Sequence, residues 1–202
     1  MIRESPVTRA SLLMRLRDGS NQEAWHEFLE LYGPLVYGFV RHRGLQDADA
    51  ADVLQDVLRS VNGAVGRLEY DKQKGGFRAW LFAITRNKLT NFVASRRARP
   101  HGSGDTAQHE QLAATPDRSD AWEQEWEREF QRQVAARAMQ IIEAEFESRT
   151  WQAFWQTAVE GRSAADVSRE IGLSTGAIYV AKSRVLARLK SEVERLMAEE
   201  ES

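Results

Sequence analysis

The chain has 202 residues, of which 42% are hydrophobic, and it contains no cysteine. This length suffices for one medium domain or two small ones, and the lack of cysteine excludes disulfides, zinc–thiolate sites and cysteine nucleophiles. No apolar run approaches the ~20 residues of a membrane span, and the N-terminus has no signal-peptide core, so we expect a cytoplasmic protein without membrane insertion.

The net charge of −2 is unevenly distributed along the chain. Residues 1–100 carry 16 Lys and Arg against 11 Asp and Glu, whereas residues 101–150 carry 5 against 11. Residues 174–190 contain four Lys and Arg and no acid. A ligand meets the local field of a protein, so two basic patches separated by an acidic middle are compatible with nucleic-acid binding.

Hydrophobic spacing predicts helices from the N-terminus onward. We expect a helix pair over residues 8–32, a break at Gly33-Pro34, and a helix over 35–43 that ends at Gly44. The next predicted helix, 47–68, is amphipathic.

The polar face of the 47–68 helix carries Asp52, Gln55 and Asp56. Asp52 and Asp56 form an i, i+4 like-charge pair, which costs a few tenths of a kcal/mol. A surface that tolerates this repulsion suits a basic partner, and a merely solvated face is about equally compatible with the pattern.

A polar loop over 69–76 leads into a long helix predicted over 75–100. One wide face of this helix is hydrophobic, and the opposite flank combines aromatic rings, amides and positive charge, which can hold unpaired bases and phosphates. A buried helix with a solvated basic flank is an equally open alternative. The candidate contacts of this region are Lys72, Lys74, Trp80, Arg86, Asn87, Asn91, Arg96 and Arg97.

Residues 101–120 are rich in Gly, Ser, Thr, Asp and Pro and predict a linker. The following residues are acidic and place Trp122, Trp126 and Phe130 at i, i+4, i+8. This spacing predicts the start of an amphipathic helix, which could dock on either domain and shield a basic patch.

Residues 131–196 predict a second domain that contains a helix-turn-helix. Ser163 can cap its short first helix, Gly172 supplies the turn, and Ser174 caps the basic second helix. A helix face of small residues that is flanked by basic side chains can enter the major groove of DNA. The alternative is an ordinary helical hairpin. The candidate DNA contacts are Ser174, Thr175, Gly176, Tyr179, Lys182, Ser183, Arg184 and Arg188.

No catalytic or metal-binding pattern is found in the sequence. The four histidines, His26, His42, His101 and His109, lack ligand spacing, and there is no GxxxxGK[ST] or GxSxG motif. We therefore expect a protein that is not an enzyme and that needs no cofactor or metal.

With these elements placed, the chain resembles bacterial RNA polymerase sigma factors of the sigma-70 family, in the extracytoplasmic-function (ECF) group. FRAWLFAITRNKLTNFVASRRARP is similar to the family's segment that melts and reads the −10 element. DADAADVLQDVL is similar to the segment that binds the polymerase clamp helices, and GRSAADVSREIGLSTGAIYVAKSRVLARLK is similar to the −35-reading helix-turn-helix. Asn91 stands where many members have Asp, and Ala51 where Glu is usual.

The resemblance implies an all-α fold with a sigma2-like domain over 8–100, a flexible acidic linker over 101–130 and a sigma4-like domain over 131–196. It implies that Asp52, Gln55 and Asp56 bind core polymerase and that the loop over 70–76 captures a flipped base. Implied partners are core RNA polymerase, through its β′ clamp helices and β flap, and promoter DNA. Many members are also held by an anti-sigma factor. One alternative is a helix-turn-helix regulator without sigma activity, which leaves Trp80, Asn87 and Asn91 without a role. A second alternative is a helical interaction protein with no DNA role.

Overall fold

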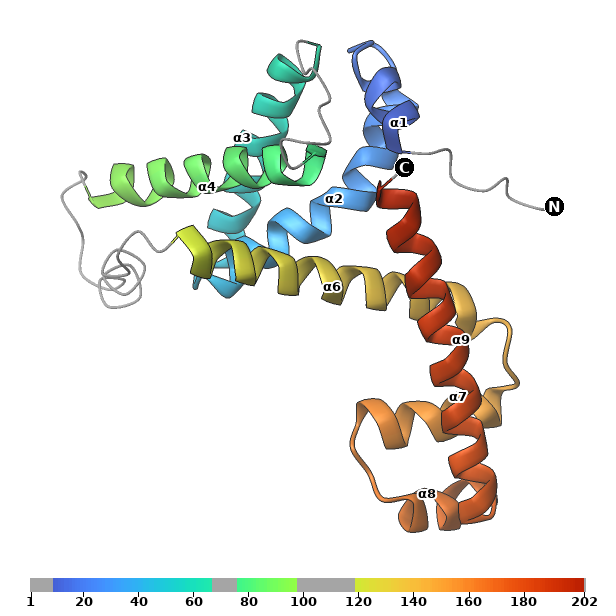
Figure 1. Ribbon diagram of the computed structural model, residues 1–202. Coiled ribbons are helices and arrows are strands. Elements are labelled where there is room, and N and C mark those ends of the chain that lie inside the picture. The colour runs from blue at the N-terminus through green and yellow to red at the C-terminus, as the bar shows by residue number, and fades with distance from the viewer. Residues whose placement is uncertain (1–8, 67–75, 98–118, 202) are drawn as a thin grey trace. The chain divides into compact units, whose positions relative to one another are not determined.

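The computed structural model describes residues 9–66, 76–97 and 119–201 (Figure 1). Every regular element in these ranges is helical, so the predicted all-α fold is confirmed. In chain order the helices are α1 (Arg9–Leu16), α2 (Gln22–His42), α3 (Asp47–Val65), α4 (Gly76–Arg97), α6 (Ser119–Glu143), α7 (Ser148–Phe154), the π-helical turn η2 (Trp155–Val159), α8 (Ala164–Ile171) and α9 (Thr175–Glu201).

The chain divides into two compact units, Met1–Gln131 and Arg132–Ser202. The first unit holds α1 to α4 and the first half of α6, and the second holds the rest of the chain. Residues 119–130, which we expected to belong to the linker, are helical, and Trp126 and Phe130 are buried. The remainder of the expected linker, 101–118, lies outside the described residues.

Helix α2 corrects the prediction of a break at Gly33-Pro34. It runs from Gln22 to His42 with Pro34 inside it. Buried residues on both sides of the proline belong to the same face, namely Phe28, Tyr32, Leu35, Val36 and Phe39. Packing of this continuous apolar face outweighs the hydrogen bond that an interior proline removes.

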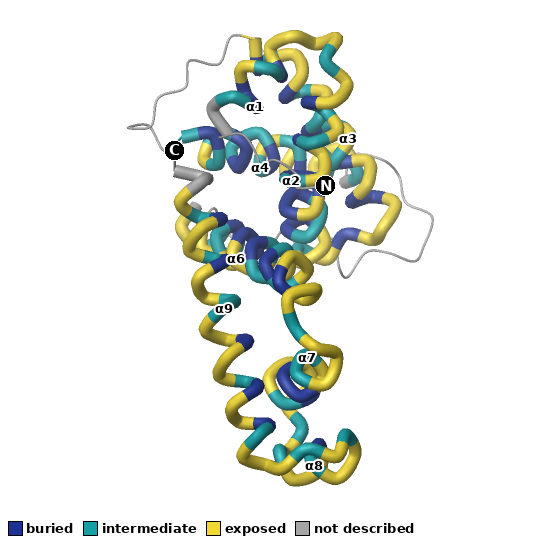
Figure 2. The backbone as a smooth tube through the Cα atoms, turned by 90° about the vertical axis from the view of Figure 1, so that its right-hand side faces the viewer, coloured by how far each residue is buried: buried dark blue, intermediate teal, exposed yellow. Residues whose placement is uncertain are grey.

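The core of the first unit lies between α2, α3 and α4. Buried positions recur along the inward side of each helix, as the dark segments of Figure 2 show. At the start of α4 the ring of Phe77 lies 5.9 Å from Phe28 and 5.1 Å from Tyr32. Asn21 caps α2 by accepting a 3.0 Å hydrogen bond from the Ala24 amide. The ring contacts of Phe77 hold the start of α4 against α2. Helix α4 carries most of the predicted strand-binding residues.

The second unit contains the predicted helix-turn-helix, formed by α8 and α9. Ser163 caps α8 by accepting a 3.1 Å bond from the Asp166 amide, and Gly172 ends it at a φ of +70°. Ser174 accepts a 3.2 Å bond from the Ala177 amide at the start of α9. The predictions for both capping serines and for the turn glycine are therefore confirmed.

Two clusters hold the second unit together. Val167 from α8 packs with Ile178 and Ala181 from α9, and Ile142 from α6 packs with Phe154 and Val185. Because Ile178, Ala181 and Val185 face inward, the opposite side of α9 faces solvent.

Candidate nucleic-acid and polymerase interfaces

Three predicted contacts of α4 share one outward line. Trp80, Asn87 and Asn91 are spaced i, i+7 and i+11, and about 100° of rotation per residue brings them within some 40° of one another. Both asparagines are exposed, whereas Trp80 is half-buried. The Trp80 ring packs against the ring of the buried Phe77, and the two ring centroids are 5.3 Å apart. This line offers an anchored aromatic ring and two amides.

Arg86 lies on a different flank of α4. Its guanidinium is 5.9 Å from the ring of Phe82, and together with Arg78 it lines a cavity that faces α6. The structure therefore separates Arg86 from the Trp80 line, beside which the sequence had placed it.

The C-terminal end of α4 is tied to α3 by an ion pair between Arg96 and Asp49. The Asp49 side chain is only 7% exposed, and the Arg96 guanidinium also lies 5.2 Å from the Phe92 ring. Arg96, a predicted phosphate contact, is thus engaged within the protein. Arg97 is the last residue of α4, and Lys72 and Lys74 lie outside the described residues.

The predicted polymerase-binding residues lie on the outer side of α3. Asp52 and Gln55 are exposed and Asp56 is half-buried. Arg59 forms a 2.7 Å ion pair with Asp56 and a 3.2 Å hydrogen bond with Gln55. Because this pair is largely solvent-exposed, it contributes about 0–1 kcal/mol and leaves the carboxylate accessible to a stronger partner.

Most predicted contacts of the helix-turn-helix lie on the solvent side of α9. Exposed residues are Ser174, Thr175, Gly176, Tyr179, Ser183 and Arg184, and Lys182 is half-buried. Tyr179 and Val180 are large and apolar, yet they are 65% and 58% exposed. Val180 was not among the predicted contacts, although it is exposed beside Tyr179.

Arg188 differs from the other basic residues of α9. Its Nε and Nη2 each donate a 2.7 Å hydrogen bond to Glu145, and its Nη1 donates a 2.9 Å bond to the buried Glu192. The bonds to Glu145 contribute most to raising the pKa of the Arg188 guanidinium, and the bond to Glu192 adds to this effect. Arg188 therefore braces α9 against the α6–α7 connection, and we revise its predicted role as a DNA contact.

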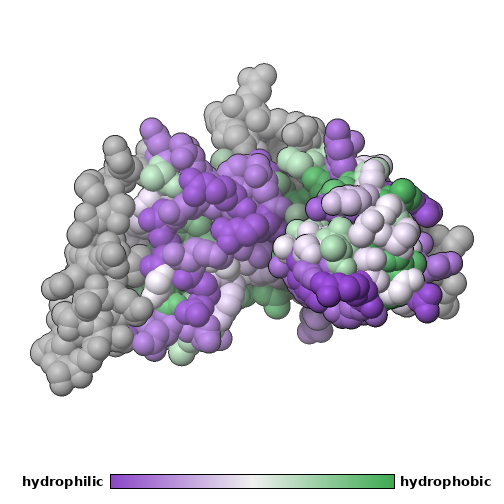
Figure 3. All heavy atoms as spheres, turned by 90° about the horizontal axis from the view of Figure 1, so that it is seen from below, coloured by the Kyte–Doolittle hydropathy of each residue, from purple (hydrophilic) through white to green (hydrophobic). Residues whose placement is uncertain are grey.

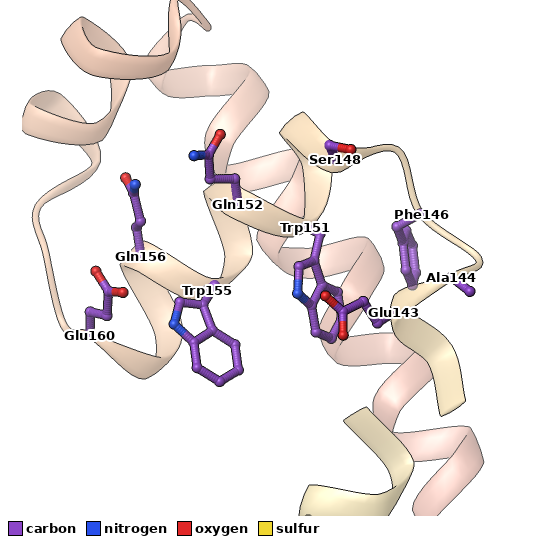
Figure 4. Close-up of a pocket in the computed structure, with 9 residues that line it drawn as sticks. All are labelled: Glu143, Ala144, Phe146, Ser148, Trp151, Gln152, Trp155, Gln156 and Glu160. Atoms are coloured by element: carbon purple, nitrogen blue, oxygen red, sulfur yellow. The ribbon is translucent and has the colours of Figure 1, made fainter. Parts of the chain in front are cut away.

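An aromatic cavity of about 750 Å³ opens on the second unit between the end of α6 and the α7–η2 helix. Trp151 and Trp155 point to the same side of that helix, with ring centroids 6.4 Å apart (Figure 4). Trp155 and Val159 are both partly exposed. No pattern in the sequence predicted this surface.

Hydrophilic residues cover much of the face seen in Figure 3. Among the described helices, none is long and apolar enough to span a bilayer. Within the same ranges, no cluster of three or more His, Asp or Glu side chains is arranged to hold a metal ion.

Residues 28–99 match the family model for Sigma-70 region 2, which covers most of α2 and all of α3 and α4. ECF RNA polymerase sigma factor ShbA of Streptomyces griseus subsp. griseus is 26% identical over 197 residues, which is 96% of this chain and 100% of that protein. Residues 28–99 thus match a sigma-70 region, and nearly the whole chain is similar to an ECF RNA polymerase sigma factor.

Two further similarities concern one other sigma factor. RNA polymerase sigma factor CnrH of Cupriavidus metallidurans is 28% identical over 95 residues, 47% of this chain and 48% of CnrH, so this match spans about half of CnrH. The solved structure of CnrH in complex with the cytosolic domain of CnrY is 21% identical, with a TM-score of 0.35 over 91% of this chain and 96% of that one.

Proposed function

We propose that the protein is a sigma factor of the ECF group that binds core RNA polymerase, reads the −35 element as duplex through α9, and holds the melted −10 strand on α4. The observation that carries the proposal is the line of Trp80, Asn87 and Asn91 within the segment that matches Sigma-70 region 2. A regulator that binds only duplex DNA has no use for a stacking ring and two exposed amides on this helix.

The −10 interaction rests on stacking and on amide hydrogen bonds. Opening duplex DNA costs about 1.4 kcal/mol per base step, and stacking on an aromatic side chain returns about 1–3 kcal/mol per base. Trp80 supplies such a ring on a rigid helix, and Asn87 and Asn91 can each donate and accept at the edge of an unpaired base. A few contacts of this kind suffice to hold a short bubble open.

The −35 interaction uses the first three turns of α9. Exposed small residues such as Gly176 and Ser183 let the helix enter a major groove, and Lys182 and Arg184 flank it as phosphate contacts. Arg188 contributes indirectly, because its bonds to Glu145 fix the helix on its domain.

Core polymerase binding is assigned to the outer face of α3, where Asp52, Gln55 and Asp56 offer acceptors for a basic partner. The exposed Trp155 and Val159 beside the aromatic cavity provide a second, apolar surface suited to a protein partner. We assign this surface to the β flap that the family resemblance implies.

Transcription by core polymerase with and without the chain tests the proposal. Run-off from fragments of the source genome should give RNAs with defined 5′ ends only when the chain is present. In the Trp80→Ala variant, duplex binding should persist. The permanganate reactivity of thymines in the open bubble should fall about 5–150-fold, because the stacking of one base is lost. A folded chain that never supports initiation from any promoter contradicts the proposal.

A further inference from the structure

The first half of α6, residues 119–131, packs onto α2 and α4 as part of the first unit. The ring of Trp126 lies 5.3 Å from Phe39 on α2 and 5.5 Å from Phe82 on α4. Trp126 and Phe130 are both buried. This segment therefore occupies a groove between the two helices, which we call the α2–α4 groove.

Two arginines of the α2–α4 groove contact both carboxylates and aromatic rings of α6. Arg43 Nη2 lies 2.6 Å from Glu125 Oε2, and its guanidinium carbon is 4.1 Å from the Trp122 ring. The Arg78 guanidinium carbon is likewise 4.1 Å from the Phe130 ring. A carboxylate beside an aromatic plane presents the same two features as a phosphate beside a base in single-stranded DNA.

One end of the groove is incompletely filled. A cavity of about 350 Å³ lies there, with Arg78 and Arg86 on one wall and Glu123, Trp126 and Glu127 on the other. Arg78 Nη2 is 3.4 Å from Glu127 Oε2, whereas Arg86 forms no ion pair with any residue in the described ranges. The basic flank of α4 thus retains capacity for an anion.

The polar contacts that hold residues 119–131 in the α2–α4 groove are weak or incomplete. The buried Trp126 Nε1 and Arg43 Nε have no hydrogen-bond partner in the described part of the protein, and a buried donor without an acceptor destabilises the docked state. The half-exposed ion pair of Arg78 and Glu127 contributes little, because solvent screens it. Residues 119–131 carry five acids against one base, so this contact also weakens with salt.

We propose that the α2–α4 groove is an anion-binding surface for single-stranded DNA and that residues 119–131 are its displaceable occupant in the free protein. This inference rests on the proposed function, since it places additional strand contacts on the helix that carries Trp80. When the acidic segment leaves, Arg43, Arg78 and Arg86 become available to phosphates, and Phe39 and Phe82 to bases. When it is docked, Arg43 is paired with Glu125 and Arg78 with Glu127, and Phe39 and Phe82 are buried. Of the three arginines, only Arg86 then stays without an ion pair to a described residue.

Gly38 offers a way to displace the segment. It lies inside α2, and a Cβ at this position would stand 2.1 Å from Glu129 Oε1 and 2.8 Å from its Cδ. Glu129 is 2% exposed and has little room to move. A Gly38→Leu substitution should therefore undock residues 119–131 while favouring helix formation in α2 itself. Gly63→Leu is the matched control, because a Cβ at Gly63 meets nothing within 4 Å.

A second variant displaces the segment by charge. Glu125 and Glu127, which face Arg43 and Arg78, are replaced together by lysine. The control carries the same change of net charge at two exposed acids of the second unit, Glu143→Lys with Glu147→Lys.

The full-length proteins are titrated with a fluorescent 12-nucleotide single-stranded DNA, with circular dichroism as the check on folding. Both undocking variants should bind about 5–10-fold more tightly than the wild type. Their salt slope should be steeper by about 1.4, because two more phosphates are neutralised at about 0.7 each. The Gly63→Leu control should match the wild type, and the charge control should gain less than its partner variant.

Adding Arg86→Gln to Gly38→Leu should remove a factor of about three in affinity, the loss of one exposed phosphate contact. Equal or weaker DNA binding by both folded undocking variants overturns the inference, and so does equal binding by the two charge variants. In that case the proposed function still holds if core polymerase initiates transcription only when the chain is present. Failure of the proposed function is recognised separately, as the absence of initiation by the wild-type chain.

Discussion

Arg184 and Arg188 lie one turn apart on α9 and look equivalent in the sequence, yet the structure gives them different roles. Arg184 is exposed on the face that would enter a groove. Arg188 donates three hydrogen bonds, two of them to Glu145, a residue 43 positions earlier in the chain. The difference lies entirely in the tertiary partner of the side chain.

The two arginines should therefore respond differently to alanine. Arg184→Ala should lower the salt slope of duplex binding by about 0.9, the value for one phosphate, and leave stability unchanged. Arg188→Ala should lower the free energy of unfolding by about 1–3 kcal/mol, because Glu145 and Glu192 lose donors. Salt titrations and urea unfolding of both variants measure these effects. A drop in salt slope without a loss of stability in Arg188→Ala would contradict the bracing role.

Glu192 makes the stability of the second unit depend on pH. The hydrogen bond from Arg195, and then that from Arg188, lowers the pKa of this buried carboxyl below its ordinary value of 4.5. A carboxyl whose pKa is lower in the folded state stabilises the fold above its unfolded pKa, and this stabilisation is lost as the pH falls through the folded pKa. Stability should thus decline as the pH is lowered below about 4.5, and Glu192→Gln should show a smaller decline in urea midpoints.

Tyr179 and Val180 add apolar contact to the proposed −35 reader. Exposed apolar side chains on a recognition helix suit the C5-methyl group of thymine. Duplexes selected by the chain from a random library should bind about 3–10-fold more weakly when deoxyuridine replaces thymidine, which removes only that methyl group. Val180→Ser should abolish part of this difference. Equal affinity for both duplexes would show that the two residues do not read thymine.

At the scale of the elements, α2 is notable for running through Pro34. An interior proline removes one hydrogen bond and costs about 3 kcal/mol in an exposed helix. Pro34 is exposed, whereas its neighbours Leu35 and Val36 are buried, so its ring adds little to the core.

Pro34→Ala should consequently stabilise the first unit. The substitution restores a backbone N–H that can donate to the preceding turn, and we expect a gain of about 1–3 kcal/mol in the free energy of unfolding. Thermal and urea unfolding followed by helical circular dichroism measures it. A decrease in stability would instead show that the proline ring has a packing role.

Local signals in the sequence predicted local structure well. Ser163, Gly172 and Ser174 act within a few residues of themselves, and the structure confirms all three. The proline break failed because a packed face extends across it. The Arg96–Asp49 pair joins residues 47 positions apart, and no spacing rule in the sequence points to such a partner. The acidic segment was recognised as amphipathic, but only the contacts with Phe39 and Phe82 show which domain it joins.

At the scale of the molecule, the boundary between the two units falls inside α6, after Gln131. The apolar contacts of Trp126 and Phe130 belong to the first unit, and those of Ile142 belong to the second. A sigma2-like fragment that stops at residue 100 therefore lacks the segment that covers Phe39 and Phe82 in the free protein.

Fragments that end at residue 100 and at residue 131 should differ in stability. Burial of one large apolar side chain contributes about 1.5–3 kcal/mol, so loss of Trp126 and Phe130 should lower the free energy of unfolding by about 3–6 kcal/mol. Urea unfolding of the two fragments measures the difference. Similar midpoints would show that residues 119–131 add nothing to the first unit.

The close approach of Gly38 to Glu129 also constrains how this sequence can drift over evolutionary time. A side chain at position 38 meets the carboxylate of Glu129, so replacing the glycine requires that Glu129 move or that residue 129 become smaller. Shortening residue 129 first would leave a void beside Gly38, which an alanine there could then fill. The two positions, 91 residues apart, should therefore change as a pair among related chains in which the segment still docks.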